Sequence, residues 1–152
     1  QRGLLAYAPR NVRLAQWQKH RPQLTAQAWE ELCRTAVPSG VMASAAGEAG
    51  GPWGVASRYW RGNQPEWNVV AQSLDGAAIL LGECKWWSRK PQSTDLAQLA
   101  DELVRRPIPH CAAGADRIVR VAFVPELPTR TYREPGVVFV TAEQVLCSLA
   151  TS

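Results

Sequence analysis

The sequence contains no hydrophobic run long enough to cross a membrane and no secretory signal pattern. A membrane-spanning helix needs about 18–20 consecutive apolar residues, and a signal peptide needs a charged start, an apolar centre and a small-residue cleavage site. The four cysteines, at positions 33, 84, 111 and 147, form no CxxC pair. Scattered cysteines in apolar contexts indicate buried free thiols in a reducing compartment. These absences predict a cytoplasmic protein without a membrane partner.

Two further absences exclude kinds of catalytic site. The two histidines, His20 and His110, have no partner residue at a useful spacing, so we expect neither to be catalytic. No GxxxxGK[ST] loop occurs, which excludes an ATP-binding P-loop within this sequence. Because the chain opens with Gln1 rather than methionine, we expect it to be a fragment, and any ATPase activity would reside in another part of the protein.

The composition is that of an ordinary globular domain. The chain has 152 residues, of which 46% are hydrophobic and 20% charged, and these values fit one domain without a second core. There is no internal repeat and no low-complexity tract. A net charge of +4 and a pI of about 9.1 are a first indication of nucleic-acid binding.

Two neighbouring segments predict a β-hairpin. Residues 65–72, a mostly apolar segment with a polar interruption, are expected to form a strand, and an apolar run at 77–81 leads into a second strand. The Asp75-Gly76 step between them supplies a turn, because these residues tolerate positive φ. A third strand is expected near residues 55–61, after a glycine-rich loop at 39–54.

The second strand of the hairpin ends in Gly82-Glu83-Cys84-Lys85-Trp86, which places an acid and a base two residues apart. Strand side chains alternate between faces, so Glu83 and Lys85 share one face. Asn68 interrupts the apolar segment of the first strand and can face the same side. Charged groups at the end of a buried strand cost solvation free energy, so either a chemical function or a plain ion pair must explain them.

A helix upstream adds an acidic residue to this group. Its apolar stripe runs from Trp29 to Val37, with Thr25 as the expected N-cap and Pro38 as the stop. At about 100° per residue, Glu30 lies at the edge of the stripe, where its side chain can reach the sheet, whereas Glu31 points away. We therefore predict that Glu30 belongs to the site, with a solvated carboxylate as the alternative.

The remaining pattern predicts an α/β fold with a central mixed sheet flanked by helices. A helix is expected to be capped by Ser93 or Thr94 and to end at Arg105-Arg106, with a buried stripe that includes Val104. Strands are expected at 117–124 and 137–140, and a short helix at 142–149. The order of helix, three-strand meander, helix, two strands and helix is typical of a mixed sheet.

The hairpin with an acid-x-Lys end resembles the PD-(D/E)xK nuclease superfamily. The segment from Trp60 to Trp86 is most similar to the nuclease-like C-terminal domain of archaeal-type DEXX-box AAA+ ATPases, and the resemblance extends over about residues 25–145. It implies a restriction-endonuclease-like core at 25–152, preceded by an N-terminal arm or connector at 1–24. It also implies that an AAA+ ATPase domain in the full-length chain is a partner.

The resemblance implies roles for the site residues. Glu30, position 68 and Glu83 would hold Mg²⁺ or Mn²⁺, together with the backbone carbonyl of Cys84. Lys85 would orient the attacking water or help to deprotonate it. A metal of this kind lowers the pKa of its bound water and stabilises charge on the phosphate.

Position 68 departs from the family pattern, because an asparagine stands where the family has a metal-binding aspartate. Hard cations favour charged oxygen ligands, and an amide offers only a neutral carbonyl oxygen. Glu66, two residues earlier, would lie roughly 6–7 Å away along the strand and substitutes poorly. Natural degeneration and an engineered substitution would look identical here. We expect a DNA phosphodiesterase domain that is inactive or impaired.

Basic and aromatic residues around the motif predict contacts with nucleic acid, where neutralised phosphates supply most of the affinity. Of the Trp86-Trp87 pair, one side chain would pack in the core and the other would be exposed for base stacking. A non-catalytic domain that binds nucleic acid, or a domain that regulates an AAA+ ATPase, is the alternative function. The predicted nucleic-acid contacts are Arg58, Arg61, Arg89, Lys90 and Trp87.

Overall fold

A computed structural model describes residues 7–46 and 51–151 of the protein. It contains a five-stranded mixed sheet with the strands in sequence order. Strands β1, β2 and β3 form an antiparallel meander, and β4 and β5 continue the sheet in parallel with β3. The elements are α1 (Arg10–Ala36), α2 (Val41–Ala46), β1 (Ser57–Tyr59), β2 (Trp67–Gln72), β3 (Ala78–Cys84), α3 (Ser93–Arg105), the 3₁₀ turn η3 (His110–Ala112), β4 (Arg117–Val124), β5 (Val138–Thr141) and α4 (Ala142–Ala150).

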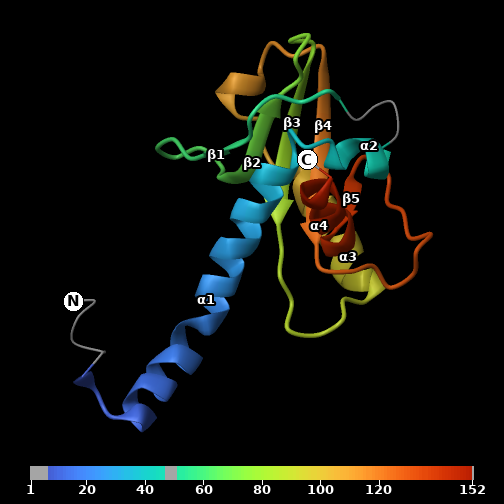
Figure 1. The fold of residues 1–152 in the computed structure, drawn as a ribbon. Coiled ribbons are helices and arrows are strands. Elements are labelled where there is room, and N and C mark those ends of the chain that lie inside the picture. Colours follow the sequence, from blue (N-terminus) through green and yellow to red (C-terminus); the bar gives the residue numbers. More distant parts are fainter. Residues whose placement is uncertain (1–6, 47–50, 152) are drawn as a thin grey trace.

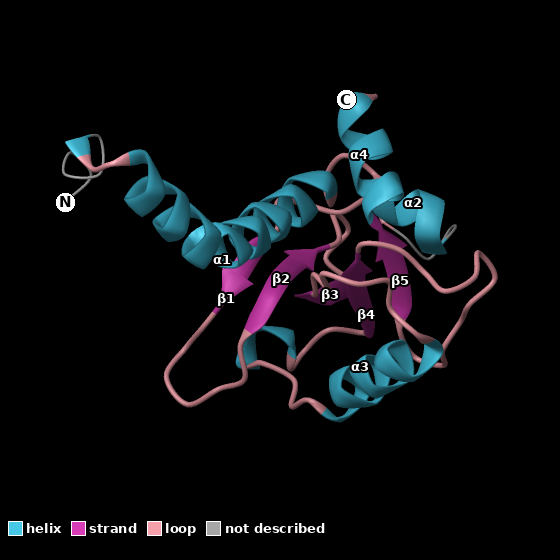
Figure 2. Ribbon diagram, turned by 90° about the horizontal axis from the view of Figure 1, so that it is seen from below, coloured by secondary structure: helices cyan, strands magenta, loops and turns pink. Residues whose placement is uncertain are grey.

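Helices cover both faces of the sheet. Figure 2 shows α1, α2 and α4 on one face and α3 on the other. Each face has its own apolar cluster, one built on Trp29, Met42 and Leu80 and the other on Leu81, Leu96 and Leu103. Because β3 lies between two covered faces, its residues from Ala78 to Glu83 are buried. The acid-x-Lys motif therefore ends a strand at the centre of the protein.

The structure confirms the predicted α/β class and the hairpin. Strand β4 has the predicted bounds, and the turn between β2 and β3 places Gly76 at a φ of 76°. Helix α3 follows its predicted stripe except at Val104, which is 45% exposed. Its N-cap is Gln92, whose side chain and that of Asp95 form a capping box, rather than Ser93 or Thr94.

The first helix is much longer than predicted. It begins at Arg10, so Thr25, the predicted N-cap, lies inside it, as does Pro22. Arginine, glutamine, leucine and alanine supply nine of the fifteen residues at 10–24, and these residue types have high intrinsic helix propensity and need no buried stripe. Figure 1 shows this part of α1 extending away from the sheet as an arm. From Arg10 onward, the expected arm is therefore helical and continuous with the domain.

Two other predictions require correction. The glycine-rich segment at 39–54 contains α2, whose Val41 and Met42 are buried, while residues 47–50 lie outside the described part of the chain. Cys33 is buried as predicted, but Cys111 and Cys147 are exposed.

None of the described helices contains a stretch that is both long enough and apolar enough to serve as a membrane span.

Gly82 allows the close approach of three strands next to the motif. A Cβ atom at this position would lie 2.9 Å from Cβ of Val69 and 3.1 Å from Cε2 of Phe123. We expect Gly82→Ala to lower the free energy of unfolding by about 1–3 kcal/mol, because strand backbones and a buried ring must shift. Urea denaturation would measure this. Gly114→Ala is the control, since nothing lies within 4 Å of its Cβ position, and an equal loss in both variants would contradict the packing argument.

Candidate functional site

The predicted acidic residues meet in a shallow pocket at the end of β3. Its volume is about 390 Å³, and α1, the hairpin and the residue after α3 all contribute to it. The structure thus brings Glu30, Asn68 and Glu83 together as the sequence predicted. Lys85 follows β3 and contacts Glu83 from outside the lining. The lining residues are Glu30, Arg58, Pro65, Glu66, Asn68, Glu83 and Arg106.

A bulge in β2 sets the position of Asn68. Ser57 pairs with Val70 but Tyr59 pairs with Trp67, so three intervals of β2 oppose two of β1. Such a bulge re-aims a side chain and interrupts the ladder. Accordingly, Oδ1 of Asn68 accepts the backbone N–H of Cys84 at 2.9 Å. Because this donor fixes Oδ1, the –NH₂ end of the amide is the end left for the pocket.

Glu83 is the most deeply buried acid of the pocket, and both of its oxygens are engaged by cations. Its side chain is 11% exposed, Oε1 lies 3.1 Å from Nζ of Lys85, and Oε2 lies 2.8 Å from Nη1 of Arg106. The Lys85 side chain is 41% exposed, so its contact is the weaker one. The pair of Glu83 and Lys85 therefore exists as predicted, and Arg106 makes it a triad.

Arg106 is the residue that the sequence did not reveal. Its guanidinium also donates to the carbonyl of Glu66 at 3.0 Å, pairs with Glu102, and lies 4.8 Å from the ring centroid of Trp67. Burial alone would lower the pKa of Arg106, but hydrogen bonds to Glu83 and Glu102 outweigh burial and raise that pKa. In sequence it reads as a helix-end charge, and only the packing of α3 on the sheet brings it to Glu83.

Glu30 reaches the pocket from α1, whereas Glu31 does not. The side chain of Glu30 is 21% exposed and that of Glu31 is 71% exposed, which agrees with the predicted helix geometry. Arg34 lies between them. Its Nη1 atom is 3.6 Å from Glu30 and donates to the backbone carbonyl of Asn68 at 2.9 Å. One arginine thus fixes α1 to the bulge of β2.

The donor set of this pocket does not fit a divalent cation. Each carboxylate already has a cationic partner, since Glu30 contacts Arg34, Glu66 pairs with Arg58, and Glu83 contacts two cations. Within residues 7–46 and 51–151, no group of three or more His, Cys, Asp or Glu side chains could hold a metal ion. The amide of Asn68 supplies no charge in compensation. Metal binding by Glu30, Glu83 and the Cys84 carbonyl stays a prediction. It would require these carboxylates to exchange their cationic partners for the metal.

The predicted nucleic-acid contacts are spread over two places. Arg58 lines the pocket, and its hydrogen bond to Glu66 raises its pKa. Arg61 is exposed in the loop between β1 and β2. Arg89 and Lys90 instead pair with acids outside the pocket, namely Asp95 on α3 and Glu126 after β4.

The two tryptophans after the motif differ in their surroundings. Trp87 is half-buried against the apolar cluster on the α3 face. Trp86 is 46% exposed and contacts the buried Trp29 edge to face, with ring centroids 5.5 Å apart. Trp86, rather than Trp87, thus presents the more exposed ring for base stacking.

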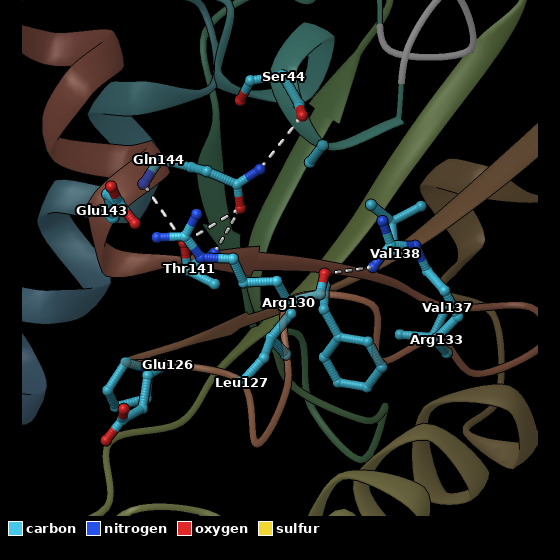
Figure 3. Close-up of a pocket in the computed structure, with 13 residues that line it drawn as sticks. Ser44, Glu126, Leu127, Arg130, Arg133, Val137, Val138, Thr141, Glu143 and Gln144 are labelled. Atoms are coloured by element: carbon cyan, nitrogen blue, oxygen red, sulfur yellow. Dashed lines mark hydrogen bonds between the residues drawn. The ribbon is translucent and has the colours of Figure 1, made fainter.

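A larger pocket lies elsewhere, between α2, α4 and the edge strand β5. Its volume is about 530 Å³. Figure 3 shows the side chain of Gln144 between Thr141 and Ser44. Its Oε1 accepts a hydrogen bond from the backbone N–H of Thr141 at 2.9 Å, and its Nε2 donates to the carbonyl of Ser44 at 3.2 Å. Arg130 and Glu143 also line it, so charges of both signs are present. None of the predicted site residues contributes to this pocket.

Comparison with known protein families matches residues 5–96 to DUF234, described as archaeal and bacterial proteins of unknown function. The matched segment includes Glu30, Asn68, Glu83 and Lys85, whereas Arg106 lies beyond it. No curated protein and no solved structure matches the chain. Since the match covers more than half of its residues, the chain belongs to the DUF234 family.

Proposed function

We propose that the chain is a nuclease-like domain of the PD-(D/E)xK type that binds DNA and whose phosphodiesterase centre is disabled at Asn68. The observation that supports this proposal is the arrangement at the end of β3. There, an acid on α1, a polar residue on β2 and an acid-x-Lys pair on β3 meet in one pocket. This arrangement is what supports a restriction-endonuclease-like core in the proposal.

The loss of hydrolysis follows from the charges around Glu83. Its two oxygens neutralise Lys85 and Arg106, and position 68 adds an amide where a second carboxylate would attract a divalent cation. Without such a cation, neither water activation nor charge stabilisation on a phosphate is supplied at this site. Lys85 is also held as an ion-pair partner rather than directed at a water molecule.

The remaining function is recognition of a phosphate backbone. Arg58 lines the open pocket and Arg61 lies in the loop between β1 and β2, and both are exposed; the whole chain carries a net charge of +4. Exposed arginines that contact phosphates release counterions, so affinity falls as salt rises. Arg58 pairs with Glu66 in the free protein, and a phosphate would replace this exposed carboxylate as its partner.

The test is a binding and cleavage assay on labelled DNA. We expect retarded DNA in the presence of EDTA, no cleavage with Mn²⁺, and a lower affinity for the Arg58→Gln/Arg61→Gln protein. The salt slope of that variant should fall by about 1–2, at about 0.7–0.9 per phosphate contact. Arg117→Gln is the control, because Arg117 is exposed at the start of β4, beside Ala78 at the other end of β3. Cleavage by the natural protein, or affinity that does not depend on salt, would contradict the proposal.

A further inference from the structure

The N-terminal part of α1, residues 10–28, has no packing partner in the described domain. The buried residues of this helix are Trp29, Cys33 and Ala36, all in its C-terminal part. Figure 1 shows the preceding turns extending away from the sheet. Their large apolar side chains are about half exposed, namely Val12 at 42%, Leu14 at 50%, Trp17 at 53% and Leu24 at 47%. Packing against the core of this domain therefore does not explain why these apolar side chains are present.

The same segment is strongly basic. It carries Arg10, Arg13, Lys19 and Arg21, and it contains no acidic residue before Glu30. Of the ten arginines after residue 28, five pair with carboxylates in the structure, such as Arg34 with Glu31. These four cations have no ion-pair partner among the described residues, so their charges are available to an external anion.

Three of the four cations and three of the four large apolar side chains of residues 10–28 occupy one face. At about 100° per residue, three arginines and three large apolar residues fall within an arc of about 100°. Lys19 lies on the opposite side of the helix. We name this surface the α1 basic face, and it consists of Arg10, Arg13, Leu14, Trp17, Arg21 and Leu24.

We propose that the α1 basic face binds DNA, with its arginines on successive phosphates and Trp17 stacked on an unpaired base. This inference rests on the proposed DNA-binding function and gives it a second contact surface. A helix of 19 residues is about 28 Å long, enough to follow several phosphates. Because α1 also carries Glu30 into the pocket and Arg34 to the backbone of Asn68, one continuous helix would connect the basic face to the nuclease-like site.

Other partners fit this surface less well. A helix that lies on a membrane separates its cations from its apolar face, whereas here arginines alternate with Leu14 and Trp17. A coiled-coil partner needs an uninterrupted apolar seam, which Arg10 and Arg21 interrupt. A second copy of the helix would bring like charges together. A polyanion with exposed aromatic rings can pair with the arginines through its charges and contact the apolar side chains through its rings.

The test compares two triple variants of the full chain. Arg10→Gln/Arg13→Gln/Arg21→Gln removes the cations of the basic face, and Lys19→Gln/Arg117→Gln/Arg130→Gln removes three exposed charges from other surfaces. Affinity for duplex and single-stranded DNA is measured over a salt series, with circular dichroism as the check on helix content. We expect the slope of log affinity against log salt concentration to become shallower by about 2–3 in the first variant. In the second variant it should change by less than one.

Trp17→Ala provides an independent test of the same surface. Stacking acts only on unpaired bases, so we expect about tenfold weaker binding to single-stranded DNA and unchanged binding to duplex. Equal losses in the two triple variants, or no loss in the first, would overturn the α1 basic face while leaving DNA binding at the pocket intact. Binding to phosphatidylserine-containing vesicles but not to DNA would also overturn it. Absence of DNA binding by the natural protein would instead remove the proposed function itself.

Discussion

Arg106→Leu is expected to lower the free energy of unfolding by about 3–5 kcal/mol, the usual cost of removing one partner from a buried ion pair. The side chains of Arg106 and Glu83 are only 13% and 11% exposed, so solvent does little to screen their interaction. After the substitution, Glu83 would keep only its contact with the more exposed Lys85. The carbonyl of Glu66 would also lose its donor at 3.0 Å. Chemical denaturation monitored by tryptophan fluorescence measures this loss.

The neighbouring residue supplies the control for this prediction. Arg105 is 78% exposed and pairs only with Asp101 one turn earlier, so Arg105→Leu should change the free energy of unfolding by less than about 0.5 kcal/mol. Adding Glu83→Gln to Arg106→Leu should recover part of the loss, because it removes the unpaired buried charge. A loss in Arg106→Leu no larger than that in Arg105→Leu would show that the ion pair does not hold α3 against the sheet.

Asn68→Asp is expected to raise the affinity for Mn²⁺ at least about tenfold, which corresponds to about 1.4 kcal/mol. The new carboxylate can keep the hydrogen bond that Oδ1 accepts from Cys84, and its second oxygen replaces the –NH₂ group that now faces the pocket. On Glu83, Oε1 is held only by the half-exposed Lys85, so this oxygen is the one that a cation can take over. Titration calorimetry with Mn²⁺ measures the change.

Asn63→Asp is the matched control for metal affinity. It adds the same charge on an exposed residue of the loop between β1 and β2, outside the pocket lining. If Asn63→Asp and Asn68→Asp raise Mn²⁺ affinity equally, the effect is general electrostatic attraction and position 68 is not part of a latent site. Mg²⁺ is expected to bind the Asn68→Asp protein as well, because both cations favour oxygen ligands.

Local sequence patterns were enough to predict the sheet and most of the pocket. The β-branched run of β4 and the Asp75-Gly76 turn are signals carried by neighbouring residues, and both are confirmed. Helix geometry favoured Glu30 over Glu31, and the family resemblance pointed to the same residue. These predictions succeeded because each depends on contacts that are close in sequence or on a fixed period.

The predictions that failed depend on tertiary packing or on intrinsic propensity. The start of α1 at Arg10 was missed because its first turns bury nothing, and a search for an apolar stripe cannot detect them. Arg106 was read as a helix-end charge, since its partner Glu83 is 23 residues away in sequence. The bulge that aims Asn68 arises from the pairing of β1 with β2, and no residue in either strand signals it.

The most direct test is Mn²⁺-dependent cleavage of single-stranded, duplex and branched DNA by four proteins: the natural sequence, Asn68→Asp, Asn68→Asp with Glu83→Ala, and Asn68→Asp with Lys85→Ala. A nuclease-like centre disabled at one ligand predicts cleavage by Asn68→Asp alone, with the Lys85→Ala protein folded but inactive. Cleavage by the natural protein at the same rate, or cleavage that survives loss of Glu83, would contradict it. Asn68→Asp that binds Mn²⁺ but cuts none of the substrates would also contradict a nuclease origin of this pocket.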